Sequence, residues 1–396
     1  MTTTTSAIEE ARKLQEEIVK LRRLIHQKPE LSFLEHETAA LAATKLEELG
    51  YKVSRGIGKT GVVAEIGEGS AVGIRADMDA LPIQESNPVP YKSENQGVMH
   101  ACGHDAHVSI ALNAARLLKE SPVKNGKIRM LMQPAEESGD EEGISGAQRM
   151  IEDCALKDLK AVIGLHVDAS LPAGKVAVLD GPIMAAVDEF TIKIKGKGGH
   201  GAYPETTIDA IVIGAQVVQA IQHIVSRRIS ALEPAVVTVG SFKSSSSRGN
   251  VIAEEVEMAG TFRTFKAETR DFIKAELIKV CSIAKTLGGD FEIKYDLDYP
   301  ATVNDPQIAK VMRQTAIDLI GEENVIEVNP KTWSEDFAYM AREVPGAFMF
   351  LGAEIEGDTR CHHSHNFDLD ESGLYIGTAI LAETARRLVA HFNNQG

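Results

Sequence analysis

One stretch of the chain, residues 71–79, has the sequence Ala-Val-Gly-Ile-Arg-Ala-Asp-Met-Asp. Its apolar start predicts a buried β-strand, and the acidic residues follow the carboxyl end of that strand, where α/β folds place their sites. Two similar strands are predicted at 127–132 and 161–167, with helices near 108–120 and 146–153. Helices that alternate with apolar strands predict an α/β domain with a mixed, largely parallel sheet flanked by helices.

The order of predicted elements changes near residue 186. Strands and helices then follow as β-α-β-β-α-β, at 190–195, 208–229, 235–242, 256–265, 268–286 and 290–297. This order is typical of a small sheet with two helices on one face. The chain has 396 residues, which is enough for two cores. We therefore expect residues 186–298 to form a smaller α+β domain, inserted into a larger domain made of residues 1–185 and 299–396.

The composition restricts the class of protein. The formal net charge is −15, from 42 Lys and Arg against 57 Asp and Glu. This balance argues against nucleic acid and against anionic membrane surfaces as partners. No secretory signal is visible, and no apolar run approaches the roughly 18 residues that span a bilayer. The four cysteines have no framework spacing, so we expect a cytoplasmic protein with reduced thiols.

A segment rich in metal-binding side chains spans residues 99–107. It holds three histidines and one cysteine in nine residues, including Cys102 and His104. Gly103 lies between these two and permits a sharp turn, so both side chains could bind one metal ion. Two alternatives remain open from the residues alone: a surface loop with a helix-capping Asp105, and a thiolate–imidazole pair of a cysteine hydrolase.

Paired carboxylates follow the predicted strand at 127–132. The side chains of Glu136 and Glu137 diverge along extended backbone, so one can bind a metal while the other faces a water molecule. An acidic surface loop is the alternative, because three more acidic residues follow at 140–142. Asp79 could orient a metal-binding imidazole, or could serve only in a turn.

Two further segments complete a possible set of ligands. His166 lies alone in an apolar strand, where a histidine is more often part of the core than a metal ligand. Residues 361–367 supply three more imidazoles, including His363. If these segments converge, thiolate, imidazole and carboxylate groups would surround a divalent metal site.

Taken together, these segments resemble the metal-dependent amidohydrolases of the aminoacylase and carboxypeptidase family. The most similar subgroup holds hippurate hydrolases, auxin–amino acid conjugate hydrolases, N-acyl amino acid hydrolases and some thermostable carboxypeptidases. The resemblance runs from about Arg22 to Leu388. The segments that carry it are Gly73–Glu85, Val98–His107, Gln133–Glu137, Gly164–His166, Gly196–Pro204, Gly260–Phe265 and Ser334–Phe337.

The resemblance implies roles for the residues of these segments. Two divalent ions per subunit, zinc or manganese with cobalt as a further option, would be bound. Cys102 stands where the wider family has a bridging Asp, Glu136 resembles the general base, and Asp79 resembles the orienting acid. The metal ligands implied are Cys102, His104, Glu137, His166 and His363.

The resemblance also extends to the inserted domain, where it implies dimerisation and a lid function. His200 resembles a residue that reaches the active site of the partner subunit and stabilises the oxyanion. Asn250 and Arg263 resemble residues that bind the carbonyl and the free carboxylate of the substrate. The assembly that the resemblance implies is a homodimer or a dimer-based oligomer.

The activity implied is hydrolysis of the amide bond of N-acyl amino acids by a water that bridges the metals. The alternative is a metallocarboxypeptidase that releases C-terminal amino acids from peptides. One departure from the subgroup is the acidic segment 138–143, which is longer than usual. It either lines the rim of the pocket and disfavours acidic substrates, or is solvated and irrelevant.

Overall fold

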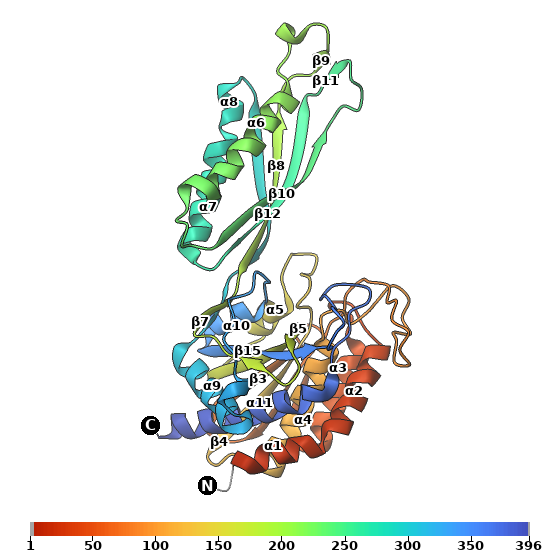
Figure 1. Ribbon diagram of the computed structural model, residues 1–396, viewed down its shortest axis with the longest axis vertical. Helices are drawn as coiled ribbons and strands as arrows, with labels where there is room; N and C mark the ends of the chain where they lie inside the picture. Colours follow the sequence, from red (N-terminus) through yellow and green to blue (C-terminus); the bar gives the residue numbers. More distant parts are fainter. Residues whose placement is uncertain (1–3, 395–396) are drawn as a thin grey trace. The chain divides into compact units, whose positions relative to one another are not determined.

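A computed structural model describes residues 4–394, which divide into two compact units (Figure 1). The smaller unit comprises Met184–Thr302 and Pro330–Glu335, and the other described residues form the larger unit. The predicted insertion at 186–298 falls inside the smaller unit. The second piece, Pro330–Glu335, was not predicted from the sequence.

The larger unit is built on a seven-stranded sheet in the order β1-β2-β4-β3-β5-β15-β6. The four strands β4, β3, β5 and β15 run parallel, whereas β1, β2 and β6 pair antiparallel with their neighbours. The prediction of a mixed, largely parallel sheet is confirmed. The strands are β1 (Lys52–Ile57), β2 (Gly61–Gly67), β3 (Ser70–Asp77), β4 (Gly126–Gln133), β5 (Leu159–Pro172), β6 (Val176–Ala177) and β15 (Gly346–Glu354).

Helices cover both faces of this sheet. Alternate residues of β3, such as Val72 and Ile74, join the main apolar core with α4 (His104–Glu120) and α11 (Leu374–Asn393). Successive strand residues point to opposite faces. Phe348 of β15 accordingly points to the other face, where its ring contacts Phe337 of α10 (Phe337–Glu343) at 4.7 Å. Helix α5 (Gly146–Glu152) packs beside α10.

The remaining elements of the larger unit surround this framework. Helix α4 begins at His104, four residues earlier than predicted, after a left-handed Gly103 with φ of 96°. The other elements are α1 (Thr4–Lys13), α2 (Gln15–Gln27), α3 (His36–Glu48), α9 (Pro306–Ile320), the 3-10 turns Glu322–Asn324 and Glu371–Gly373, and the short pair β7 (Gly181–Met184) and β14 (Thr302–Asn304).

The smaller unit is an antiparallel four-stranded sheet in the order β10-β12-β8-β13, with α6 and α7 packed against it. The predicted β-α-β-β-α-β order is confirmed. Its main elements are β8 (Ala186–Lys195), α6 (Ala210–His223), β10 (Ala235–Ser244), β12 (Glu255–Thr264), α7 (Ala267–Cys281) and β13 (Asp290–Tyr299). Smaller ones are β9 (Gly199–His200), the 3-10 turn Pro204–Thr206, the π-helical turn Ile224–Arg228, β11 (Val251–Ile252) and α8 (Ile283–Thr286).

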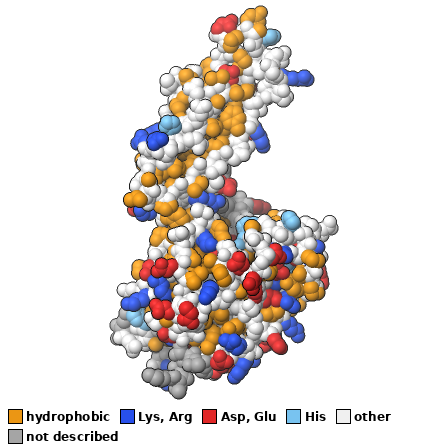
Figure 2. All heavy atoms as spheres, in the orientation of Figure 1, with side chains coloured by type: hydrophobic (Ala, Val, Ile, Leu, Met, Phe, Trp, Pro, Cys, Tyr) orange, Lys and Arg blue, Asp and Glu red, His pale blue; other side chains and the backbone are white. Residues whose placement is uncertain are grey.

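The smaller unit exposes much apolar surface, and Figure 2 shows apolar side chains along its visible face. Of the twelve exposed large apolar side chains among the described residues, nine lie in this unit. They include Ile211 and Val212 of α6, and Val236 and Phe242 of β10. Within residues 4–394, no helix is both long and apolar enough to cross a membrane.

Candidate metal centre

Three segments that are far apart in sequence meet around the thiol of Cys102. Its Sγ lies 3.4 Å from Nε2 of His166 on β5, and 3.3 Å from Nε2 of His363 in the segment that follows β15. Cys102 itself precedes α4 and is 8% exposed. The site therefore lies beyond the carboxyl ends of the parallel strands, as in other open α/β sheets.

The predicted ligands form two groups that share Cys102. One group is Cys102, His104 and His166, and the other is Cys102, Glu137 and His363; within each, the ligand atoms lie within 4.8 Å of one another. Donor atoms about 2.0–2.3 Å from one tetrahedral ion are roughly 3.5 Å apart. The distances of 3.4 Å and 3.3 Å from the Cys102 sulfur fit this value, so each of the two groups that contain Cys102 could hold one cation.

The imidazoles are oriented for metal binding. Nδ1 of His104 donates to the carbonyl oxygen of Asp79 at 2.9 Å, and Nδ1 of His166 donates to that of Val167 at 2.7 Å. Because Nδ1 carries the proton in both rings, the lone pair lies on Nε2. Nε2 of His104 is buried and has no hydrogen-bond partner among residues 4–394. A cation bound there would satisfy this atom.

The electrostatic field of the site favours a cation beside His104. Burial alone would lower the pKa of His104, but Asp77, Asp79 and Glu137 outweigh it and raise the pKa to about 10. Burial lowers the pKa of His166 to about 4, which keeps that ring neutral and able to bind a metal. A divalent ion on Nε2 of His104 would supply the positive charge that the surrounding carboxylates favour.

The two neighbouring carboxylates follow β4. Oε1 of Glu137 lies 3.3 Å from Nε2 of His363, and Oε2 of Glu136 lies 3.9 Å from Nε2 of His104. The Asp79 carboxylate accepts hydrogen bonds from the backbone N–H groups of Glu136 at 3.1 Å and Glu137 at 3.0 Å. Asp79 therefore fixes both the His104 ring and the backbone that carries the carboxylate pair.

Two residues near the site were not predicted. Asp77 forms an ion pair with Arg75 at 2.6 Å and binds Nδ1 of His107 at 2.6 Å. Nε2 of His107 accepts a hydrogen bond from the backbone N–H of Val167 at 3.0 Å. His107 thus supports the strand next to His166, and its lone pair is already used. The three-residue spacing from His104, which places both on one face of α4, was the available signal.

The other imidazoles of segment 361–367 have structural contacts. Nε2 of His362 accepts a hydrogen bond from the backbone N–H of Ala169, and its ring lies 4.8 Å from that of Phe367. Nδ1 of His365 lies 2.7 Å from Oγ of Ser86. The structure therefore brings only His363 of this segment to Cys102 and Glu137.

The acidic segment 138–143 is anchored by Asp140. Its carboxylate pairs with Lys59 and Arg149 and accepts the backbone N–H groups of Glu142 and Ile144. These contacts, with Lys59 first, hold the pKa of Asp140 well below its ordinary value. Glu142 is exposed and also pairs with Arg149. Much of the negative charge of the segment is thus neutralised locally.

The predicted residues of the smaller unit lie at two separate places. The exposed His200 and Asn250 lie side by side, because β9 pairs with β11 and the N–H of Gly201 donates to the carbonyl oxygen of Asn250 at 2.8 Å. Arg263 lies near the other end of β12, and its Nη1 donates to Oγ of Ser334 at 3.3 Å. Eight residue steps from the start of β12 to Arg263 span roughly 26 Å. One copy of the unit therefore does not bring Asn250 and Arg263 together.

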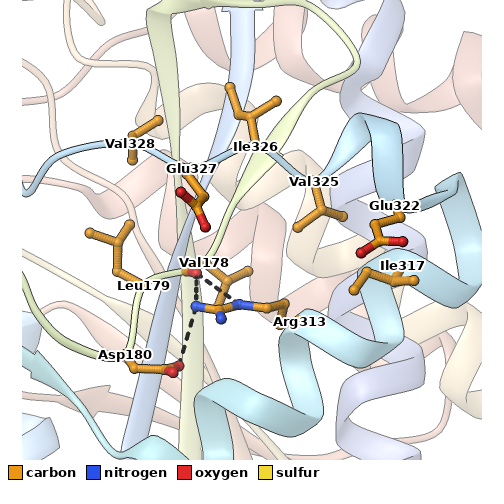
Figure 3. A pocket seen from close by; sticks show the side chains of 10 residues that line it. All are labelled: Val178, Leu179, Asp180, Arg313, Ile317, Glu322, Val325, Ile326, Glu327 and Val328. Carbon is orange, nitrogen blue, oxygen red and sulfur yellow. Dashed lines mark hydrogen bonds and ion pairs between the residues drawn. The ribbon is translucent and has the colours of Figure 1, made fainter.

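A separate cavity of about 410 Å³ lies in the larger unit between segment 178–180, α9 and residues 322–328. Figure 3 shows the guanidinium of Arg313 held there by the carbonyl oxygen of Val178 and by Asp180. None of the predicted site residues lines this cavity. It offers no thiolate or imidazole and is distinct from the candidate metal centre.

Comparisons with known proteins agree with this geometry. The chain is 41% identical over 381 residues to N-acetyl-L-cysteine deacetylase of Bacillus subtilis, covering 95% of this chain and 89% of that protein. It is 38% identical to thermostable carboxypeptidase 2 of Saccharolobus solfataricus over 93% of this chain and 94% of that protein. The solved YXEP protein of Bacillus subtilis, described as a dinuclear metal-binding peptidase, superposes with a TM-score of 0.82 at 33% identity, over 96% of this chain and 99% of that one.

The sequence model of one protein family matches residues 73–387 of the chain. This span includes every residue assigned to the two ligand groups, together with Glu136, His200, Asn250 and Arg263. The resemblance stated from the sequence is thereby confirmed. The chain belongs to peptidase family M20/M25/M40 and is a hydrolase that acts on amide bonds.

Proposed function

We propose that this enzyme hydrolyses the amide bond of N-acyl amino acids and releases the free amino acid. The observation that carries the proposal is the pair of ligand groups around Cys102, with the Glu136 carboxylate beside them. The relative named N-acetyl-L-cysteine deacetylase supports a small acyl group on the substrate.

Two divalent cations would be held by Cys102, His104, Glu137, His166 and His363. Bound there, such ions would polarise the amide carbonyl and lower the pKa of a water molecule. A thiolate with imidazoles suits zinc, whereas a carboxylate in the second group also admits manganese or cobalt. Elemental analysis of the purified protein distinguishes these metals.

Glu136 is the proposed general base and acid. Its carboxylate is 8% exposed, and Asp79 fixes its backbone, so the side chain is held in a largely dry environment close to the ligands. Glu136 would accept a proton from the attacking water and then deliver it to the leaving amine. The neighbouring Glu137 lies beside His363 and is therefore proposed as a metal ligand and not as the base.

Arg263 is the proposed anchor for the free carboxylate of the substrate. Its guanidinium is partly buried, which lowers its pKa, and Ser334 is the hydrogen-bond partner of its Nη1. None of the carboxylates whose side chains the structure describes forms an ion pair with Arg263. A substrate carboxylate could therefore bind it, and this contact would favour substrates that end in a free amino acid.

A homodimer is proposed because His200 and Asn250 lie outside β12, near its start, whereas Arg263 lies roughly 26 Å along that strand from its first residue. Residues that must act on one small substrate cannot come from both places in one copy. The exposed apolar side chains of α6 and of the edge strand β10 offer a surface for a second copy (Figure 2). His200 would then stabilise the oxyanion in the site of the partner subunit.

A carboxypeptidase is the second candidate, favoured by the relatives named thermostable carboxypeptidases. The same residues would act on a peptide in place of a small acyl group. Rates on N-acetyl and N-benzoyl amino acids, measured beside N-blocked dipeptides, separate the two activities. Faster cleavage of the dipeptides would overturn the first proposal. We place the enzyme in the cytoplasm, because none of the four cysteines forms a disulfide within the described residues.

A further inference from the structure

Two carboxylates bind three consecutive backbone N–H groups in the segment that carries the catalytic pair. Oε1 of Glu35 accepts the N–H of Ala135 at 2.8 Å. Oδ1 and Oδ2 of Asp79 accept those of Glu136 at 3.1 Å and Glu137 at 3.0 Å. The resemblance assigned a role to Asp79, but neither the sequence nor the resemblance assigned one to Glu35.

Glu35 is fully buried just before the start of α3, and both oxygens of its carboxylate accept hydrogen bonds. Oε1 also accepts the backbone N–H of Phe33 at 2.8 Å, and Oε2 accepts the hydroxyl of Thr60. A carboxylate is expensive to bury unless it is fully hydrogen-bonded. These three donors meet that requirement without placing Glu35 in contact with any proposed metal ligand.

The residue that Glu35 holds has an unusual backbone. Ala135 has a φ of 46°, in the left-handed region that residues other than glycine seldom adopt. Its N–H is bound by Glu35, and its carbonyl oxygen accepts the N–H of Gly146 at 2.9 Å. A Cβ at residue 146 would lie 1.6 Å from the carbonyl oxygen of Pro134, so glycine is required for this approach. Both sides of the Ala135 peptide are therefore fixed from outside.

We infer that Glu35 is a positioning residue for the Glu136–Glu137 pair, acting through the left-handed turn at Ala135. The inference rests on the proposed function. The turn sets the direction in which the chain leaves β4, and so decides where both carboxylates point. The side-chain hydrogen bonds of Glu35 are with Phe33, Thr60 and Ala135, none of them a proposed metal ligand, so its effect is transmitted through the backbone.

This role has a selective consequence for metal binding. Glu137 belongs to the ligand group with Cys102 and His363, whereas the group with Cys102, His104 and His166 does not use the segment after β4. Loss of the Glu35 contact should therefore weaken the binding of the cation at Glu137 and leave the binding of the other cation unchanged. A general loss of protein stability would weaken the binding of both cations.

The test is a metal titration of Glu35→Ala with zinc, in competition with a chromophoric chelator, beside kcat and KM on an N-acyl amino acid. We expect the first zinc to bind as in the wild type, and the second to bind about 10–100-fold more weakly. We expect kcat to fall by a similar factor, with a smaller change in KM, because Glu136 is displaced from the reacting water.

Rescue separates positioning from a merely structural role. In Glu35→Gln the amide oxygen can still accept both N–H groups and the NH2 can donate to Thr60, so the second zinc should bind as in the wild type. In the double variant Glu35→Ala/Ala135→Gly, glycine adopts the left-handed turn unaided, so part of the second affinity should return.

Glu30→Ala is the matched control. Glu30 lies in the same segment and accepts the N–H groups of Glu37 and Thr38 at 2.9 Å each, but it does not bind segment 134–137. The Glu30→Ala variant should lower the free energy of unfolding and leave both zinc affinities unchanged. If Glu35→Ala does not fold, Glu35→Asp replaces it, because a shorter carboxylate keeps its charge but withdraws from Ala135.

Three results would overturn the inference. The first is that both zinc affinities of Glu35→Ala, or of Glu35→Asp in its place, equal those of the wild type. The others are that both affinities fall by the same factor, or that Glu30→Ala lowers the second zinc affinity as much as the Glu35 variant does. The proposed function fails in a different way. A wild-type protein that binds two zinc ions but cleaves no N-acyl amino acid would remove the proposed substrate, and the zinc titration would still decide the role of Glu35. A wild type that binds no divalent cation would overturn both.

Discussion

The two units of this chain hold their candidate functional residues in opposite ways. In the larger unit Asp79 and His104 are buried, and backbone groups fix the rings and carboxylates. In the smaller unit His200 and Asn250 are exposed and lie far along the sheet from Arg263. The proposed homodimer would account for this difference: the larger unit holds both candidate ligand groups by itself, whereas His200 and Asn250 would act only in the site of a second copy.

The largest effect is expected from loss of the proposed general base, Glu136, in the larger unit. Glu136→Ala should lower kcat by about 10²–10⁴-fold, because proton transfer loses its carrier. Both metals should remain bound, since Glu136 is in neither group that contains Cys102. Single-turnover rates and metal content of the purified variant measure the two quantities. Near-normal turnover would remove Glu136 from the mechanism.

The buried framework of the larger unit can be tested at Arg22. Its guanidinium is fully buried and pairs with Asp105 at 2.8 Å, Asp368 at 3.1 Å and Glu371 at 3.0 Å. Arg22→Met leaves these carboxylates without their shared cation, so the free energy of unfolding should fall by about 3–5 kcal/mol.

Arg23→Met is the control for this prediction. Arg23 is the adjacent arginine, is 43% exposed at its side chain and, among the acidic side chains that the structure describes, forms its ion pair with Glu371. Its loss should cost less than about 1 kcal/mol. Urea unfolding of both variants measures the difference, and equal losses would contradict the view that the buried charges hold the site together.

The need for a second copy can be tested by mixing subunits. His200→Ala and Arg263→Ala should each lose most of their activity, because one removes the oxyanion donor and the other the carboxylate anchor. Dimers reassembled from an equal mixture should recover about a quarter of the wild-type activity, since half of them are mixed and each mixed dimer has one complete site. Absence of recovery, with dimers present in sedimentation, would show that His200 and Arg263 of one subunit serve the same site, and would contradict the proposed sharing between subunits.

The smallest effect concerns pH and the buried Glu35 of the larger unit. Burial and the charge of Asp79 raise its pKa to about 7, from an ordinary value of 4.5. Between these values the folded metal-free protein keeps a proton that the unfolded chain has released, so stability should fall as pH rises through this window.

The glutamine of Glu35→Gln cannot ionise, so this variant should not show the loss of folding stability that the wild type shows as pH rises. Relative to that variant, the wild type should lose up to about 3 kcal/mol between pH 4.5 and pH 8. Urea unfolding in the presence of a chelator measures it. Parallel pH dependence in the two proteins would show that Glu35 keeps an ordinary pKa.

The sequence predicted the fold class and the strands that lead into the site, because apolar periodicity is a local property. It did not predict β15, although its apolar run Gly346–Ala353 lies in the middle of the parallel sheet. The start of α4 was also misplaced: the histidines and Asp105 after Gly103 have the composition of a loop, but tertiary packing makes them helical. Propensity is a weak guide where buried contacts decide the structure.

The candidate ligands could be named from the sequence because thiolate, imidazole and carboxylate groups are rare in apolar surroundings. The supporting residues could not. Glu35, Asp77 and Arg22 are ordinary charged residues in the sequence, and their importance comes from partners 30 to 349 positions away. Only the folded chain shows which carboxylate binds which backbone group.

The sharing of Cys102 by both ligand groups has a consequence for the conditions under which the enzyme can work. Oxidation of this one sulfur to a sulfinic acid would remove a ligand from both groups in a single event, and that step is not reversed by ordinary thiols. A carboxylate at the same position would not be oxidised by peroxide. If Cys102 is the shared ligand, the enzyme would keep its activity only under reducing conditions, and a thiol reductant would be as necessary as the metal during purification.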